Sequence, residues 1–208
     1  MIANLKVDNS EIAFFDFDGT ITSKDTLAEI LKFIKGKFNY YLGILALSPV
    51  IALYKFRLLS NHRAKEILLI YFLKGMDVNE FNSLCQEFTE KKLPHLLKKS
   101  ALHEIRKHLQ RKTPVVVISA SPENWIFPWC SKYNIECIAT KLEVKNGKLT
   151  GKIEGRNCSG LEKVRHIQTR FKLSDYQKIY AYGDSKDDLP MLALATEKNY
   201  KPFRKFSY

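Results

Sequence analysis

The sequence IAFFDFDGT at residues 12–20 decides the fold, because an apolar run ends there in two carboxylates, a glycine and a threonine. The apolar part is typical of a strand buried on both faces, so a charge at Asp16 needs a specific reason. Side chains alternate along a strand, so Asp16 and Asp18 point the same way while Phe17 points to the opposite face. Gly19 lets the backbone turn sharply at the carboxyl end of the strand, where open parallel sheets bind ligands. The stretch therefore predicts a binding or catalytic site.

Length and cysteine content narrow the class of protein. A chain of 208 residues can hold one domain of ordinary core size, or a core with a small insertion, without covalent cross-links. Its 4 cysteines form no C-x-x-C pair, and no charged and apolar leader precedes the first strand. We therefore expect a reduced, cytoplasmic protein.

The net charge of +12 is compatible with three kinds of partner, because a positive field concentrates nucleic acid, a membrane surface or an anionic small substrate. No apolar run reaches the roughly 18 residues that a spanning helix requires. The nearest run, residues 40–54, contains Pro49 and has basic residues on either side. It predicts a buried cap helix, with an interfacial helix as the alternative. The basic residues that follow it are Lys55, Arg57, Arg63 and Lys65.

Apolar periodicity predicts an α/β fold in which a helical block interrupts alternating strands and helices. Strands are expected at 12–17, 114–118, 135–139 and 178–182, and Asn146-Gly147 within 141–155 indicates a two-residue hairpin turn. Helices are expected at 25–37, 40–56, 62–73, 78–92, 99–110, 123–133, 161–171 and 189–194. We therefore predict a doubly wound, mostly parallel sheet formed by residues 1–22 and 97–208, with an inserted all-helical cap at 23–96.

Three of the expected strands end in polar residues. Asp16, Ser119 and Asp184 each follow an apolar run. Strands that alternate with helices are connected by right-handed crossovers and run parallel, so their carboxyl ends share one edge of the sheet. We expect these three side chains to lie close together at that edge.

The acidic residues at this edge predict a site for a hard cation. Asp16 and Asp18 would meet the cluster formed by Asp184, Asp187 and Asp188, and no Cys or His ligand pair lies nearby in the sequence. An all-oxygen set of this kind suits octahedral coordination, and Mg²⁺ fits best. The 5 histidines have no H-x-x-x-H or similar spacing, so zinc is not expected.

The same residues predict phosphoryl transfer. Beside a divalent ion, Asp16 could stay ionised in a low-dielectric site and attack phosphorus to form an aspartyl-phosphate. Asp18 could protonate the departing alkoxide and later take a proton from water. Ser119 and a lysine would supply a hydroxyl donor and a positive charge to the phosphoryl oxygens. Lys163 is the candidate lysine, with Lys141 and Lys172 as alternatives.

These motifs resemble those of the haloacid dehalogenase superfamily of phosphohydrolases, subfamily IB, in which a helical cap follows the first motif. Residues 16–20, DFDGT, resemble the D-x-D-x-T nucleophile loop. Ser119 resembles the second motif, Lys163 the third, and residues 183–188, GDSKDD, the G-D-x-x-x-D fourth motif. Together the four motifs cover the chain from end to end, so the resemblance implies the superfamily's Rossmann-like core as well as its chemistry.

The resemblance implies a role for each matching residue. It implies that Asp16 is the nucleophile and Asp18 the acid and base. It implies Mg²⁺ bound by the Asp16 carboxylate, the Asp18 backbone carbonyl and Asp184, with Asp188 and Asp187 as further direct or outer-shell partners. The substrate-binding positions that it implies are Gly19, Thr20, Asp25 and Ala120.

The chain is similar in length and cap placement to phosphoserine phosphatases but departs from them at the substrate positions. Gly19 replaces their serine, Asp25 takes the place of their glutamate, and Ser119-Ala120-Ser121-Pro122 replaces a serine followed by paired glycines. The apolar, proline-broken cap segment looks more like the branch that contains phosphatidylglycerophosphatase C. That similarity implies a lipid phosphate and cap contact with an anionic bilayer.

The predicted function is therefore a Mg²⁺-dependent phosphomonoester hydrolase that acts through an aspartyl-phosphate on a small phosphorylated metabolite or a lipid phosphate. The alternatives are a peripherally attached phosphatidylglycerophosphate phosphatase and a phosphoserine phosphatase. A basic nucleic-acid-binding module is least favoured, because the lysines are spread over every segment.

Overall fold

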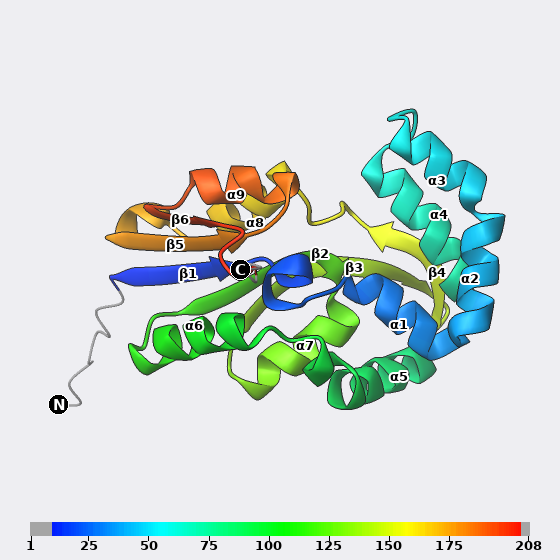
Figure 1. The fold of residues 1–208 in the computed structure, drawn as a ribbon, viewed down its shortest axis with the longest axis horizontal. Coiled ribbons are helices and arrows are strands. Elements are labelled where there is room, and N and C mark those ends of the chain that lie inside the picture. Colours follow the sequence, from blue (N-terminus) through cyan, green and yellow to red (C-terminus); the bar gives the residue numbers. More distant parts are fainter. Residues whose placement is uncertain (1–9, 205–208) are drawn as a thin grey trace.

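The structure is a computed structural model that describes residues 10–204, in which helices cover both faces of a six-stranded sheet (Figure 1). The strand order is β4-β3-β2-β1-β5-β6, and neighbouring strands are parallel except for β3 and β4. The strands are β1 (Glu11–Phe15), β2 (Val115–Pro122), β3 (Glu136–Lys145), β4 (Lys148–Glu154), β5 (Lys178–Gly183) and β6 (Glu197–Tyr200). The predicted doubly wound, mostly parallel sheet is confirmed. The outer parts of the predicted core, 1–9 and 205–208, lie outside the described residues.

Strand β1 lies at the centre of the sheet because it is apolar on both faces. Its residues from Ile12 to Phe15 are fully buried. Phe15 aligns with Val117 of β2 on one side and with Tyr182 of β5 on the other. Asp16 follows directly, so the central strand delivers its carboxylate to the carboxyl edge of the sheet.

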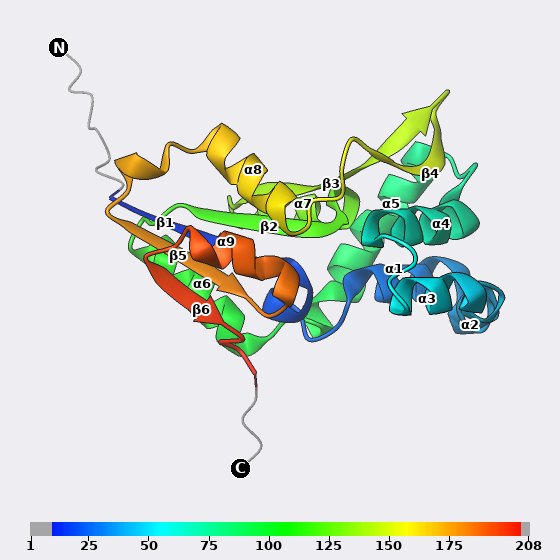
Figure 2. The ribbon, with the colours of Figure 1, turned by 90° about the horizontal axis from the view of Figure 1, so that it is seen from above.

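Two helical layers cover the two faces of the sheet, as the two views agree (Figures 1 and 2). Ala13 and Phe15 belong to the core shared with α6 (Lys99–Gln110) and α7 (Glu123–Lys132). Ile12 and Phe14 belong to the core shared with α8 (Leu161–Arg170) and α9 (Leu189–Ala193). Alternate residues of one strand thus enter opposite cores, as the twofold period of a strand requires.

Between β1 and β2 the chain forms a group of helices at the carboxyl end of the sheet (Figure 2). These helices are α1 (Thr26–Lys35), α2 (Lys37–Ala46), α3 (Ser48–Lys55), α4 (Asn61–Leu73) and α5 (Val78–Lys91). The single helix expected at 40–56 is wrong, because α2 ends at Ala46 and Pro49 occupies the first turn of α3. The expected burial is also wrong, because α2 buries only Gly43 and α3 buries none of its residues. Proline lacks the amide hydrogen that a helix interior needs but fits a first turn. Within residues 10–204, no helix combines the length and apolarity needed to cross a bilayer.

A β-hairpin connects the sheet to these helices. Asn146 and Gly147 have φ angles of 51° and 72°, which confirms the predicted turn. The hairpin extends along α4, where the amide of Gly75 donates to the Leu149 carbonyl at 2.8 Å and the Leu149 amide donates to Met76 at 2.9 Å. The residues predicted as cap therefore share backbone hydrogen bonds with a hairpin that the sequence assigns to the core.

Candidate active site

The Asp16 carboxylate lies at the end of β1 and is almost fully buried. Its Oδ1 accepts a hydrogen bond from Lys163 Nζ at 2.6 Å, and its Oδ2 accepts one from Thr20 Oγ1 at 3.1 Å. Burial raises the pKa of Asp16 to about 7, against the attraction of Lys163 and with a further upward contribution from Asp188. Thr20, a predicted substrate contact, thus holds the side chain of Asp16.

Asp18 lies two residues further on, in the turn that follows β1. Its Oδ2 accepts a hydrogen bond from Ser121 Oγ at 2.6 Å, and its Oδ1 accepts one from the backbone amide of Thr26 at 2.6 Å. Burial and the nearby charge of Asp25 raise its pKa, while the hydrogen bonds from Ser121 and Thr26 lower it. Two hydrogen bonds therefore fix the Asp18 side chain, and its raised pKa makes it easier to protonate than an exposed aspartate.

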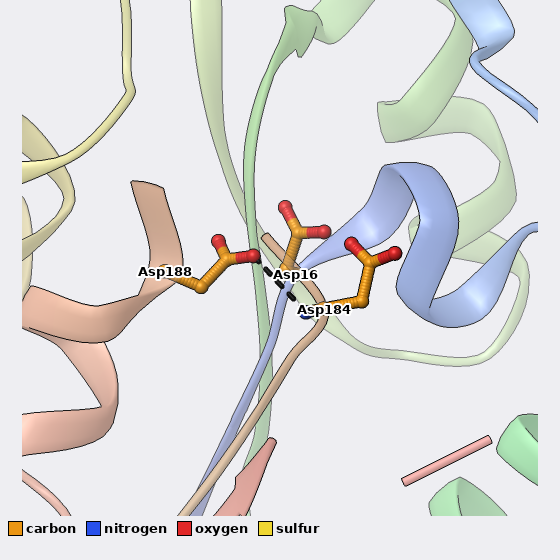
Figure 3. Close-up of side chains that lie close together, drawn as sticks. All are labelled: Asp16, Asp184 and Asp188. Atoms are coloured by element: carbon orange, nitrogen blue, oxygen red, sulfur yellow. Dashed lines mark hydrogen bonds between the residues drawn. The ribbon is translucent and has the colours of Figure 1, made fainter. Parts of the chain in front are cut away.

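Three carboxylates from two strand ends and a following turn converge at the edge of the sheet (Figure 3). Asp16, Asp184 and Asp188 each offer an oxygen, and these oxygens all lie within 4.8 Å of one another. The amide of Asp184 donates to Asp188 Oδ2 at 3.1 Å, which ties two of the three together. Burial raises the pKa of Asp184, and the charge of Asp188 adds to this. An all-carboxylate set with repelling charges fits a hard divalent cation such as Mg²⁺.

The carboxylates of Asp18 and Asp187 lie outside this set. Asp187 Oδ2 accepts from Ser159 Oγ at 2.6 Å and from Asn61 Nδ2 of α4 at 3.4 Å. Asp187 therefore connects the turn after β5 to α4 and to the segment before α8.

Lys163 is buried between two carboxylates. Its ammonium lies 2.6 Å from Asp16 Oδ1 and 2.6 Å from Asp188 Oδ1. Burial alone would lower the pKa of Lys163, but the two carboxylates outweigh burial and raise it. The same ion pair, with hydrogen bonds from Ser185, holds the pKa of Asp188 below its usual value despite burial. The alternative Lys172 is exposed and pairs with Asp175.

The two serines at the end of β2 occupy different places. Ser119 is fully buried, and its Oγ accepts a hydrogen bond from the Ser121 amide at 3.0 Å. Ser121 lines the cavity at the site and bonds Asp18, whereas Ser119 is not among the lining residues. Sequence reasoning missed the role of Ser121, because the pairing of β2 with β3 is irregular between Ser119 and Pro122.

A cavity of about 440 Å³ lies over the carboxylates. Its floor includes Asp16, Asp18, Lys163 and Asp188, and the predicted substrate positions Asp25 and Ala120 also line it. The lining residues do not include Gly19 and Thr20. The wall formed by residues between β1 and β2 is mostly apolar and includes Leu27, Leu47, Val50, Ile51, Tyr54 and Leu68. Sequence reasoning also missed further polar residues of the lining, among them Lys65 of α4 and Asn157.

Comparison with known proteins identifies the class to which this fold and site belong. Residues 13–193 match the haloacid dehalogenase-like hydrolases, and the chain belongs to that family. The chain is 33% identical to Protein CicA of Caulobacter vibrioides over 192 aligned residues. These residues are 91% of this chain and 85% of that protein.

Two further relatives extend the comparison. A Mycobacterium tuberculosis protein described as a "probable phosphatase" is 30% identical over 189 residues, which are 86% of this chain and 64% of that protein. A solved structure described as a phospho-aspartyl intermediate analogue of phosphoserine phosphatase matches this chain with a TM-score of 0.64 and 19% sequence identity. The match covers 90% of this chain and 84% of the chain in that structure. That structure supports the fold, and the family assignment makes this chain a hydrolase.

Proposed function

We propose that this chain is a Mg²⁺-dependent phosphatase that hydrolyses phosphomonoesters through an aspartyl-phosphate on Asp16. The observation that carries the proposal is the position of the Asp16 carboxylate, which shares an acidic cluster with Asp184 and Asp188 and contacts the buried Lys163 ammonium at the floor of a cavity. Membership of a hydrolase family and the relative described as a probable phosphatase support the proposal.

Asp16 acts as the nucleophile. An Asp16 oxygen forms a bond to phosphorus while the ester P–O bond breaks, and water later cleaves the acyl phosphate to release inorganic phosphate. Thr20 and Lys163 orient the carboxylate. Mg²⁺ held by Asp16, Asp184 and the Asp18 carbonyl, with Asp188 close by, would supply positive charge against the phosphoryl oxygens. Lys163 stabilises the same charge as a buried cation.

Asp18 acts as the general acid and base. Its raised pKa favours a protonated carboxyl group that can give its proton to the leaving alkoxide, and the resulting carboxylate can then take a proton from water. Ser121 and the Thr26 amide fix its orientation in both states.

Residues 23–96 are proposed as a cap domain that closes the cavity over a core formed by 1–22 and 97–208. Its apolar wall fits the body of a phosphorylated metabolite or the start of a lipid chain better than a small polar leaving group such as serine. This favours a substrate with apolar surface.

A phosphatidylglycerophosphate phosphatase attached peripherally to a membrane is the second candidate. Large apolar side chains are exposed on and next to α2 and α3, and they include Phe38, Leu45, Phe56 and Leu58. Between residues 33 and 76 the only acidic residue is Glu66, while basic residues recur. An apolar surface with positive charge is suited to anionic lipid headgroups. Co-sedimentation with anionic and with neutral vesicles tests this candidate, and a protein that stays in the supernatant with both would argue against it.

The main test combines turnover with detection of the intermediate. The wild-type chain should release phosphate from a panel of amino-acid, sugar, nucleotide and lipid phosphate esters only when Mg²⁺ is present. Asp16→Asn should lose this activity, and acid-quenched wild type, but not the variant, should gain the mass of one phosphoryl group on the peptide that contains residue 16. Mg²⁺-dependent turnover that persists in Asp16→Asn would refute the mechanism.

A further inference from the structure

Lys65 enters the cavity from the cap side, on α4. Its ammonium donates hydrogen bonds to the Ala120 carbonyl and to Asn157 Oδ1, the latter at 3.2 Å. Both partners are neutral oxygens, whereas Lys163 is held by two carboxylates. The two lysines of the cavity therefore differ: the charge of Lys163 is compensated, and that of Lys65 is met by dipoles.

Burial makes the charged form of Lys65 costly. Burial lowers the pKa of Lys65 to about 8, and repulsion from Lys163 lowers it as well. The pKa is raised, to a smaller extent, by Asp18, Asp25 and Cys158. Asp18 and Asp25 attract this ammonium from beyond salt-bridge distance, so an anion that contacts it directly would stabilise the charged form further. Because the side chain lines an open cavity, that anion can come from a ligand.

The position of Lys65 relative to Asp18 indicates which part of a substrate it would meet. The Ala120 carbonyl that Lys65 binds is followed by Ser121, whose hydroxyl binds Asp18. Asp18 is the proposed donor to the leaving-group oxygen, so Lys65 lies on the leaving-group side. Lys163 contacts Asp16 and lies on the phosphoryl side.

We propose that Lys65 is a specificity-determining residue that binds a second anionic group, a carboxylate or a phosphodiester, on the leaving group of the substrate. The inference rests on the proposed phosphatase function and narrows its substrate class. The neighbouring Leu68 and Ile51 of the wall would contact the rest of the leaving group. Preferred substrates then carry a phosphomonoester, a further negative charge and apolar surface.

Pairs of esters that differ in the second charge test the proposal. Phosphoglycolate and ethyl phosphate form the carboxylate pair, and phosphatidylglycerophosphate and phosphatidic acid form the phosphodiester pair. In Lys65→Met, kcat/KM for the ester that carries the second anionic group should fall about 10- to 100-fold in the preferred pair. The loss should come mainly through KM, as expected for loss of a charged hydrogen bond. The ester that has only the phosphomonoester group should change much less. The pair that responds identifies the source of the second charge.

Two variants separate recognition from folding. Lys65→Arg keeps the charge and should retain most of the discrimination, and Lys74→Met removes an exposed lysine at the end of the same helix and should behave as wild type. An equal loss for both members of every pair, or no loss for either, would overturn the proposal, because a purely structural lysine does not distinguish the leaving groups.

Binding to a catalytically inactive background separates this inference from the proposed function. Calorimetry should compare Asp16→Asn with Asp16→Asn/Lys65→Met. The double variant should bind phosphoglycolate or phosphatidylglycerophosphate more weakly, and it should bind ethyl phosphate or phosphatidic acid unchanged. If the wild type turns over no ester, the phosphatase proposal fails while this comparison still decides the role of Lys65. Equal affinities for both backgrounds would overturn it.

Discussion

Gly19 lies so close to Asp184 that a β carbon at residue 19 would sit 2.5 Å from Asp184 Oδ2. Gly19 also has a φ of 80°, a backbone conformation that disfavours side chains. The resemblance implies a substrate-binding role for Gly19, and the structure indicates that Gly19 also makes space beside the acidic cluster. The missing side chain leaves room for the Asp184 carboxylate to join Asp16 and Asp188.

Gly19→Ala should therefore weaken Mg²⁺ binding and turnover together. The added methyl group must displace the Asp184 carboxylate, and the positive φ adds about 1 kcal/mol of strain. We expect an increase of about tenfold or more in the Mg²⁺ concentration needed for half-maximal activity, since tenfold corresponds to only about 1.4 kcal/mol. Gly147→Ala is the control, because Gly147, in the hairpin turn, has a φ of 72° but nothing within 4 Å of its added β carbon. An unchanged Mg²⁺ requirement in Gly19→Ala, with the same stability loss as the control, would contradict this prediction.

The stability of the metal-free protein should fall as pH rises from about 4 to about 7. The pKa of Asp16 is raised by burial from 3.8 to about 7, so the folded state binds the proton more tightly than the unfolded state does. The stability that this provides is complete below the unfolded pKa and is lost as pH rises through the folded one. Asp188, whose pKa is lowered from 3.8, opposes this slope near pH 4 and adds none above about pH 5, where it is ionised in both states.

Asp16→Asn removes this contribution. Urea unfolding with a chelator should therefore give a shallower pH dependence in the variant than in the wild type, by up to about 1.4 kcal/mol per pH unit. Asp18 and Asp184 also have raised pKa values, so part of the slope should remain in both proteins. Parallel stability curves would show that Asp16 does not titrate in this range.

The role of Ser121 predicts a change in the pH profile of the reaction. Its hydroxyl stabilises the ionised form of Asp18 and lowers the pKa of that group, so Ser121→Ala should raise the pKa further. The alkaline limb of kcat, which reports loss of the acid, should move to higher pH, and the maximal rate should fall by about tenfold as Asp18 loses one of its two anchors. Ser119→Ala is the comparison, because Ser119 bonds the Ser121 amide and not Asp18. A profile that moves in Ser119→Ala but not in Ser121→Ala would reverse the two roles.

The central strand and the acidic cluster were predictable because their signals are local. An apolar run that ends in Asp16 marks a buried strand, and the alternation of strands and helices places Asp184 at the same edge of a parallel sheet. Strand β6, with the sequence EKNY, was missed because it is a short, charged edge strand that pairs with β5 through backbone atoms. No apolar pattern marks such a strand.

The roles of Ser121 and Lys65 depend on tertiary structure. The pairing of β2 with β3 shifts register between Ser119 and Pro122, so simple alternation does not predict where Ser121 points. Lys65 reads in the sequence as part of a basic flank, and only the packing of α4 over the sheet edge brings it to Ala120. Contacts between residues 55 positions apart leave no periodic signal in the chain.

The contact of the β3–β4 hairpin with α4 should control the local stability of α4. Gly151 has a φ of 80°, and a β carbon there would lie 2.4 Å from the Ile70 α carbon, which is backbone and cannot rotate away. Gly151→Ala should therefore separate β4 from α4 and speed hydrogen exchange in α4 and at Gly75, while β1 and β5 stay protected. Gly147→Ala also adds a side chain at positive φ but meets nothing within 4 Å, so it should leave exchange in α4 unchanged. If both variants speed exchange in α4 equally, strain within the hairpin, and not the clash with Ile70 of α4, causes the effect.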